Sequence, residues 1–186
     1  MLPATDADSP AMYVRCGPGE AVGRPRPGDF LLVRGVGWLG RGIRGYQRMC
    51  ARGATERALA HWSHAALVVT NSGLLVEAIP AGVVLARIEK YRDQEYHYVH
   101  VALSDADRAD VTRYAISCLQ AKYGRRTFVL LMISKLLGGR FRVPDRGQQG
   151  CVALIVRALQ RVGVPFQHQA TDMSVADLAK RFGVRP

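Results

Sequence analysis

One of the four cysteines in this chain stands where a thiol can become a nucleophile. Cys151 follows Gly150 and begins an apolar stretch, residues 151–162, whose pattern predicts a helix ending at Gly163. A thiol at a helix N-terminus lies near unpaired backbone N–H groups and the positive end of the helix dipole, which lower its pKa from about 8.5 toward neutrality. The backbone N–H of Cys151 could also stabilise an oxyanion. The alternative is a buried cysteine that only packs.

A thiol nucleophile needs an imidazole to take and return its proton, and His64 is the candidate. His64 begins a run of strand type, residues 64–70, directly after Trp62 and Ser63. The alternative is a histidine that is hydrogen-bonded at a strand end and does no chemistry. No pair of a histidine with a cysteine has metal-ligand spacing, so the sequence predicts neither a metal nor another cofactor.

Glu77 is a carboxylate inside an otherwise apolar run, residues 74–79, and could orient the ring of His64 as the third member of a triad. The two runs predict a hairpin, in which the residue numbers of paired positions have a constant sum. His64 and Glu77 share a face only if that sum is odd. A two-residue loop at 71–72 gives 143 and meets the condition, whereas a three-residue loop does not. The alternative is a glutamate on an edge strand that faces solvent.

The elements around these residues change from strand to helix patterns along the chain. Turn residues at 25–28 precede a strand at 29–33, and a glycine-rich, amphipathic stretch at 34–58 suits a short helix. Further strands are predicted at 83–87 and 96–103, and further helices from the cap Ser104 to Gly124, at 127–137 and at 174–182, with a loop at 140–150. This order predicts an α+β fold in which helices cover an antiparallel sheet. Residues 1–23 lack periodicity and predict a flexible N-terminal arm.

The chain is strongly basic, with 26 Lys and Arg residues against 15 Asp and Glu residues and a net charge of +11. Such a surface attracts anions such as nucleic acid, phospholipid headgroups or an acidic substrate, although a coding bias toward arginine would give the same composition. The excess is greatest at residues 24–57, which hold eight arginines and two acids, and the alternative there is a solvated basic face. No nucleic-acid-binding motif is recognisable, so nucleic acid is the less favoured partner.

Neither a leader nor a membrane span is predicted. The first thirty residues contain no apolar core of a signal peptide, and the longest apolar run, residues 128–137, is too short to cross a bilayer. The four cysteines form no CxxC pair. We therefore expect a cytoplasmic protein in a reducing compartment, unless another export route exists.

Taken in order, these segments resemble the circularly permuted NlpC/P60 cysteine hydrolases, the YiiX-like, papain-like amidases related to lecithin:retinol acyltransferases. In that family a Gly-Asp strand, a Ser-His strand, a Glu-Ala strand and a late helix beginning with Cys follow one another, so the nucleophile comes after the histidine. The matching segments are PGDFLLVR at 27–34, GIR at 42–44, WSHAALVV at 62–69, LVEAI at 75–79 and GCVALIVRAL at 150–159.

The resemblance implies one permuted papain-like domain over residues 24–186, with the nucleophile at a helix N-terminus. It implies that Cys151 is the nucleophile, that His64 is the base and then the acid, and that Glu77 orients His64. Candidate substrate-binding residues are Tyr123, which the resemblance suggests, and Trp38, Arg44 and Tyr46 of the basic segment.

The sequence departs from the family after the nucleophile, where Val152 and Ala153 replace the usual Ser and Glu. The triad is retained, but the substrate class is left open. The prediction is a thiol hydrolase that cleaves a peptide-like amide, cell-wall peptides included, or an acyl bond through a thioester. The alternatives are a lipid-directed acyltransferase with the same triad and a non-catalytic basic module that binds a membrane or nucleic acid. An anionic substrate and peripheral membrane contact fit the charge.

Overall fold

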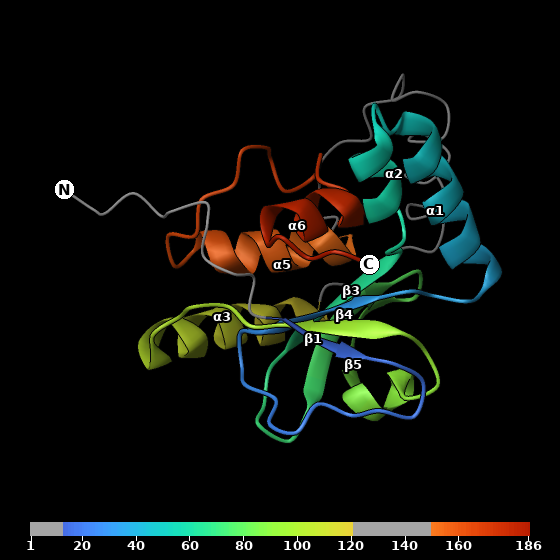
Figure 1. Cartoon of the computed structure of the whole chain (residues 1–186). Coiled ribbons are helices and arrows are strands. Elements are labelled where there is room, and N and C mark those ends of the chain that lie inside the picture. The colour runs from blue at the N-terminus through green and yellow to red at the C-terminus, as the bar shows by residue number, and fades with distance from the viewer. Residues whose placement is uncertain (1–12, 121–149) are drawn as a thin grey trace.

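The computed structural model describes residues 13–120 and 150–186 (Figure 1). Its centre is a six-stranded antiparallel sheet in the order β1-β6-β2-β3-β4-β5. The strands are β1 (Tyr13–Cys16), β2 (Phe30–Val33), β3 (His64–Val68), β4 (Leu74–Ile79), β5 (Gly82–Arg87) and β6 (Tyr96–Val99). The α-helices in the described parts are α1 (Trp38–Cys50), α2 (Ala54–Leu59), α3 (Asp105–Ser117), α5 (Cys151–Gln160) and α6 (Val175–Arg181), and 3-10 turns lie at η1 (Ile88–Tyr91) and η2 (Cys118–Gln120).

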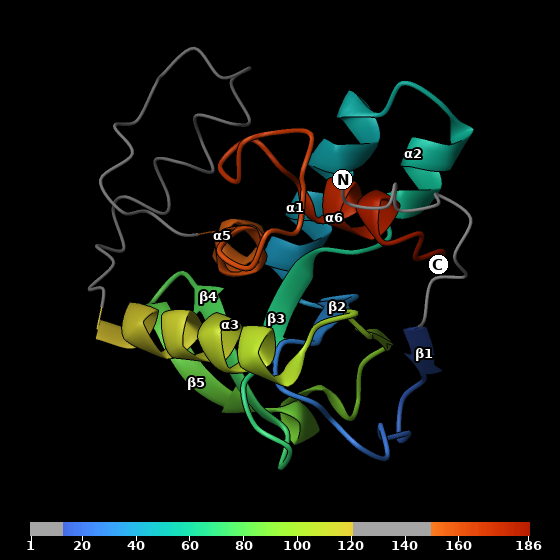
Figure 2. The same cartoon turned by 90° about the vertical axis from the view of Figure 1, so that its left-hand side faces the viewer.

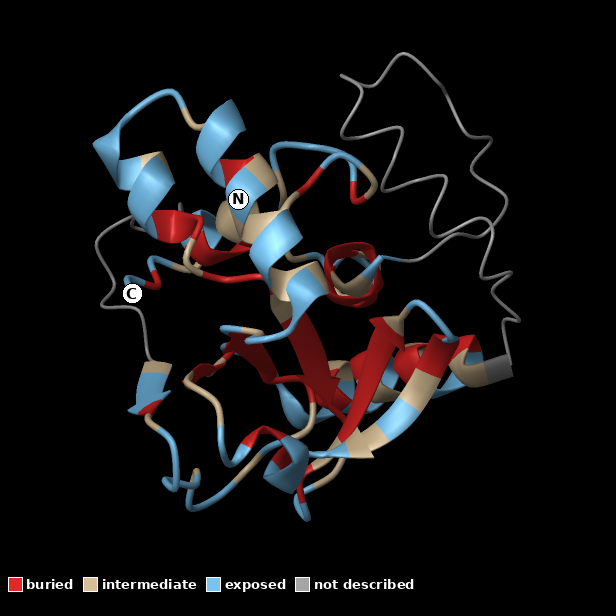
Figure 3. Ribbon diagram, turned by 90° about the vertical axis from the view of Figure 1, so that its right-hand side faces the viewer, coloured by how far each residue is buried: buried red, intermediate tan, exposed pale blue. Residues whose placement is uncertain are grey.

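The sheet separates two apolar clusters. On one face α3, α5 and α6 cover alternate residues of the central strands, and α3 packs against α5 (Figure 2). On the other face η1 and the segment before β2 cover the remaining positions, with Ile88 and Tyr91 in that cluster. Strand β2 is therefore buried at all four positions, as expected for a strand covered on both faces (Figure 3). The predicted α+β class with an antiparallel sheet is confirmed.

Most of the predicted elements are present, and two of the differences have a clear cause. The flexible arm predicted over residues 1–23 is wrong for Tyr13–Cys16, which forms β1 and pairs with β6 along its whole length. Strand β6 ends at Val99 and not at residue 103, because the backbone N–H of Val101 bonds to the side chain of Asp29 instead of a neighbouring strand. Helix α2 was not predicted, and the predicted helix at 127–137 lies outside the described residues.

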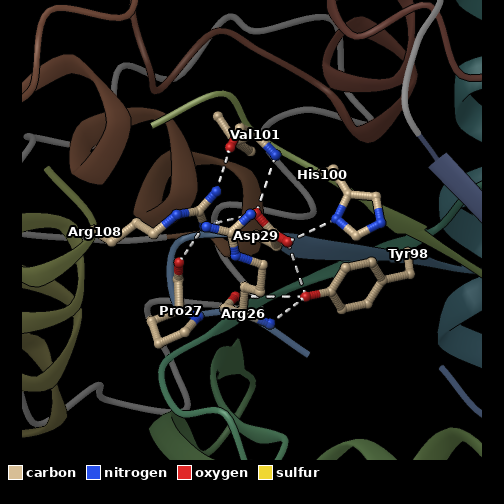
Figure 4. Close-up of polar contacts among 7 residues, drawn as sticks. All are labelled: Arg26, Pro27, Asp29, Tyr98, His100, Val101 and Arg108. Carbon is tan, nitrogen blue, oxygen red and sulfur yellow. Dashed lines mark hydrogen bonds and ion pairs between the residues drawn. The ribbon is translucent and has the colours of Figure 1, made fainter. Parts of the chain in front are cut away.

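Asp29 is fully buried and holds together the start of β2, the end of β6 and helix α3 (Figure 4). Its carboxylate accepts hydrogen bonds from Val101 N–H at 3.0 Å, from the Tyr98 hydroxyl at 2.9 Å and from Arg108 Nη1 at 2.9 Å, and it contacts His100 Nδ1 at 2.9 Å. Arg108 is itself buried, so each charge relies on the other. The Gly-Asp pair of the sequence therefore has a structural role in this chain.

We expect Asp29→Ala to lower the free energy of unfolding by about 3–5 kcal/mol, because it leaves the Arg108 guanidinium buried without its carboxylate. Denaturant unfolding of the full chain measures this loss. Asp110→Ala is the matched control, since Asp110 forms an exposed ion pair with Arg113 on the same helix and should change stability by less than about 1 kcal/mol. Equal effects of the two substitutions would contradict the role given to Asp29.

The helix caps agree with the sequence. Ser104 caps α3 by accepting a hydrogen bond from Asp107 N–H, and Ser174 and Asp177 form a reciprocal capping box at α6. Helix α1 runs for 13 residues despite its glycines. At Gly40 there is a steric reason, because a Cβ there would lie 2.5 Å from the carbonyl oxygen of Gly35. In the described residues no helix combines the length and the apolar character that a membrane span needs.

Candidate functional site

The hairpin of β3 and β4 places His64 and Glu77 on one face of the sheet. Leu67 pairs with Val76 and Val68 pairs with Leu75. In both pairs the residue numbers sum to 143, the value predicted for a two-residue loop. A hydrogen bond of 3.2 Å from Gly73 N–H to the Thr70 carbonyl closes the two-residue loop. The conditional prediction from the turn residues is confirmed.

His64 and Glu77 are joined by a hydrogen bond of 2.8 Å between Nε2 of the ring and Oε2 of the carboxylate. Glu77 is entirely buried, whereas the side chain of His64 is about one-fifth exposed. A buried carboxylate accepts from Nε2–H and thereby fixes the tautomer of a neutral ring. Nδ1 of His64 is then the nitrogen left to exchange a proton with a nucleophile.

Two further side chains hold Glu77, and the sequence analysis missed both. Lys90 Nζ pairs with Oε1, and the Tyr91 hydroxyl donates a hydrogen bond to Oε2. Both residues come from the short turn η1, which follows β5. The signal for them was Glu77 itself, because a fully buried carboxylate needs a compensating charge and several donors. Lys90 is one of only four lysines in an arginine-dominated chain.

Cys151 occupies the first position of α5, as predicted, and is partly exposed. Gly150 precedes the helix and has no side chain to cap it, so the first backbone N–H groups are not taken by a cap. The thiol lies close to the His64 ring and to the backbone N–H groups of Ala65 and Val152, and all three lower its pKa. The thiol, the imidazole and the carboxylate therefore form a continuous chain of contacts.

The strands beside the thiol separate, and this separation makes room for it. The pairing of β3 with β4 stops at Leu67 and Val76, although β4 continues to pair with β5 as far as Ile79. Near its start, β3 has no partner residue on β4, and the backbone N–H of Ala65 there lies close enough to the Cys151 thiol to lower its pKa. The site is formed where the sheet opens beneath the N-terminus of α5.

Electrostatics in the site favour a thiolate–imidazolium pair. Burial opposes the charged ring of His64, but hydrogen bonds and charges from Cys151 and Glu77 outweigh it and raise the pKa of His64 to about 9. Burial also opposes the thiolate of Cys151, but the hydrogen bond and charge of His64 and the two backbone donors lower the pKa of the thiol. For Glu77, hydrogen bonds from its three partners overcome burial and lower the pKa to about 2.

The other predicted site residues are not brought to the thiol by any contact in the described part of the chain. Arg44 donates a hydrogen bond to the Gly35 carbonyl, and Tyr46 hydrogen-bonds with Cys50 on its own helix. Trp38 is 79% exposed at the start of α1. Tyr123 lies outside the described residues. Substrate-binding roles for these four residues remain predictions.

The remaining thiols and hollows lie apart from the triad. All four cysteines are free, with Cys16 and Cys118 buried and Cys50 exposed. Two cavities of about 710 and 410 Å³ occur among the described residues, and neither is lined by Cys151 or His64. The larger borders Arg108 on α3, and the smaller borders Cys16 on β1. The candidate triad is therefore identified by the types and positions of its side chains and not by either of these cavities.

A scan against protein-family models and a search of the curated proteins each found no match to this sequence. The chemistry of the site therefore stands on the arrangement of its own side chains.

Proposed function

We propose that this chain is a thiol hydrolase that cleaves an amide or acyl bond through a thioester on Cys151. One arrangement carries the proposal: a hydrogen bond of 2.8 Å joins His64 to the buried carboxylate of Glu77, and the thiol of Cys151 lies close enough to the His64 ring for each group to shift the pKa of the other. The lowered pKa of the thiol and the raised pKa of the ring are the shifts that a thiolate nucleophile requires.

The reaction follows from these groups. The thiolate of Cys151 attacks the substrate carbonyl carbon, and backbone N–H groups at the N-terminus of α5 stabilise the oxyanion. The imidazolium of His64 gives its proton to the leaving amine or alcohol as the bond to carbon breaks, which leaves a thioester. His64 then takes a proton from water as the hydroxyl adds to the thioester carbonyl. Release of the acid restores the thiolate and the imidazolium.

The resemblance to permuted NlpC/P60 hydrolases supports the same reading of the fold and the substrate. It favours a permuted papain-like domain and a peptide-like amide or an acyl lipid as substrate. Four free cysteines, one of them reactive, suit a reducing compartment such as the cytoplasm.

The test is to trap the covalent intermediate. The full chain is treated with an activated acyl ester, quenched with acid and examined by mass spectrometry. We expect one acyl group on the peptide that contains Cys151, and its loss with time as the thioester hydrolyses. Cys151→Ala should show no such adduct, whereas the control Cys50→Ala, which removes an exposed thiol outside the site, should behave as the original chain.

Adding an amine or alcohol acceptor separates hydrolysis from acyl transfer, because a transferase would release the acyl group onto the acceptor. Acylation that is absent, or that falls on Cys50, would overturn the proposal.

A further inference from the structure

The side of α1 that points away from the protein is apolar. Residues spaced by four, three and four positions share one face of a helix, and on this face they are Trp38, Gly42, Gly45 and Met49. Trp38 is 79% exposed and Met49 is 80% exposed, and a Cβ placed on either glycine would meet nothing within 4 Å. Figure 3 views the side of the molecule on which α1 lies and shows much of the helix exposed. We call these four residues the outer face of α1.

The opposite side of α1 makes polar contacts with the protein. Gln47 is buried, donates a hydrogen bond of 2.7 Å to the Trp62 carbonyl, and accepts one of 3.0 Å from Ala176 N–H. The side chain of Ser63 accepts a hydrogen bond from Gly35 N–H, beside the close contact at Gly40. These contacts fix the helix against the segment that leads to His64. Leu39 and Ile43, which precede Gln47 at four-residue spacing, are partly buried, so α1 presents apolar residues to the protein as well as on its outer face.

Arginines flank the outer face without acidic partners. Residues 34–52 contain five arginines and no aspartate or glutamate. Arg41 and Arg48 follow the outer face along one side and are exposed, and neither forms an ion pair within the described residues. Burial and the positive charges of Arg34, Arg48 and Arg41 lower the pKa of Arg44, which shows how closely these charges are gathered.

We propose that the outer face of α1 docks onto an anionic phospholipid surface, independently of the hydrolase activity proposed above. An exposed tryptophan and methionine between arginines is the composition of a helix that lies in a membrane interface, with apolar side chains in the acyl region and guanidinium groups at the headgroup phosphates. A nucleic-acid surface would require the arginines to be outermost. Among the described residues, Trp38 and Met49 are the most exposed large apolar side chains, and Val36, 68% exposed, continues the apolar surface beyond the helix.

The two tryptophans of the chain allow a direct test. Trp62 is fully buried, so a change in intrinsic fluorescence on docking arises from Trp38. We expect vesicles that contain phosphatidylserine and phosphatidylcholine to shift the emission to shorter wavelength, and brominated lipid to quench it. Phosphatidylcholine alone should have little effect, and added salt should weaken the binding. Trp38→Phe should abolish the spectral shift.

Substitutions on the two parts of the surface separate their contributions. Arg41→Gln with Arg48→Gln should weaken binding in a vesicle sedimentation assay about 30-fold, if each arginine contributes as a typical basic residue does at an anionic surface. Trp38→Ala with Met49→Ala should weaken it by about tenfold or more. The matched control is Leu85→Ala with Arg87→Gln on β5, which removes an exposed apolar side chain and an exposed arginine from a different surface and should leave binding unchanged.

Circular dichroism of each variant establishes that it is folded before its binding is compared. Three results would overturn the proposal: no dependence on phosphatidylserine, equal loss in the β5 control, or tighter binding to a DNA duplex than to vesicles with no shift in Trp38 emission. Hydrolysis of a soluble activated ester should persist in the variant that combines Arg41→Gln with Arg48→Gln, so failure of docking is distinguishable from failure of the catalytic proposal.

Discussion

His64→Ala is expected to slow alkylation of Cys151 at pH 7 by about 30- to 100-fold. In the original chain the imidazolium and the backbone donors lower the pKa of the thiol, so more of it is the reactive thiolate at neutral pH than in an ordinary cysteine. Without the ring, burial raises the pKa of the thiol with less to oppose it. A cysteine with a pKa of about 8.5 or higher is only a few per cent thiolate at pH 7. Turnover of an ester should fall further, by about 10⁴-fold, because the proton donor and acceptor is also lost.

The pH dependence of this reaction gives a second readout. The pKa of His64 is raised to about 9, so the ring is protonated at neutral pH and loses its proton as the pH rises through 9. Turnover of the original chain should therefore decline above about pH 9, when the leaving group no longer receives a proton. The alkylation rate of Cys151 should reach its plateau at a lower pH than that of an ordinary cysteine, because its pKa is lowered. In His64→Ala the alkylation rate should instead rise steadily through pH 8 to 10.

The control for this substitution is His61→Ala, three residues earlier. His61 contacts Glu95 at 3.0 Å and has no contact with Cys151 in the described structure. It should alter the alkylation rate by less than about twofold. Peptide mapping gives an internal reference as well, because Cys50 is exposed and should react at the same rate in every variant. A wild-type pH profile for Cys151 that matches that of Cys50 would contradict the triad.

Glu77→Gln is expected to lower turnover by about 10²- to 10⁴-fold while leaving Cys151 and His64 in place. The amide has the size of the carboxylate but no charge, so it stabilises the imidazolium less and no longer dictates which ring nitrogen carries the proton. The pKa of His64, followed by the NMR shifts of its ring protons, should fall from about 9. The measurement is turnover of an activated ester alongside this titration. The matched control is Glu89→Gln, an exposed glutamate on η1, which should change neither quantity.

The same substitution has a signature in stability. The pKa of Glu77 is about 2 in the folded chain, well below its ordinary value of 4.5. A depressed pKa contributes stability that is present above the unfolded value and is lost as the pH falls toward the folded one. The stability difference between the original chain and Glu77→Gln should therefore be greatest above about pH 5 and shrink toward pH 2. A difference that is constant from pH 7 to pH 3 would show that the carboxylate is not held as described.

Local sequence signals predicted the geometry that depends on local structure. The register that joins His64 to Glu77 followed from the length of one turn, and the position of Cys151 followed from a glycine before an apolar helix. Both are encoded within a few residues. Ser104 and Ser174 were recognised as caps for the same reason.

What the sequence did not predict depends on contacts between segments, which no pattern within one segment reveals. Lys90 and Tyr91 reach Glu77 only because β5 returns along β4 and the chain turns immediately afterwards, and no periodic pattern marks that turn. The four residues of β1 are too few for a pattern and become a strand through pairing with β6. The early end of β6 is decided by Asp29, about seventy positions earlier in the sequence.

The parts of the site are assembled at different distances along the chain. Glu77 contacts His64, Lys90 and Tyr91, which all lie within the continuous segment 64–91. The contacts around the carboxylate therefore form within this segment. Of the three triad residues, Cys151 is the one most distant along the chain. It reaches the other two only when α5 packs over the gap between β3 and β4. An unfolded or half-folded chain therefore carries a thiol with an ordinary pKa. Under the proposed function, the heightened reactivity of Cys151 is a property of the completed fold, because its neighbours reach it only there.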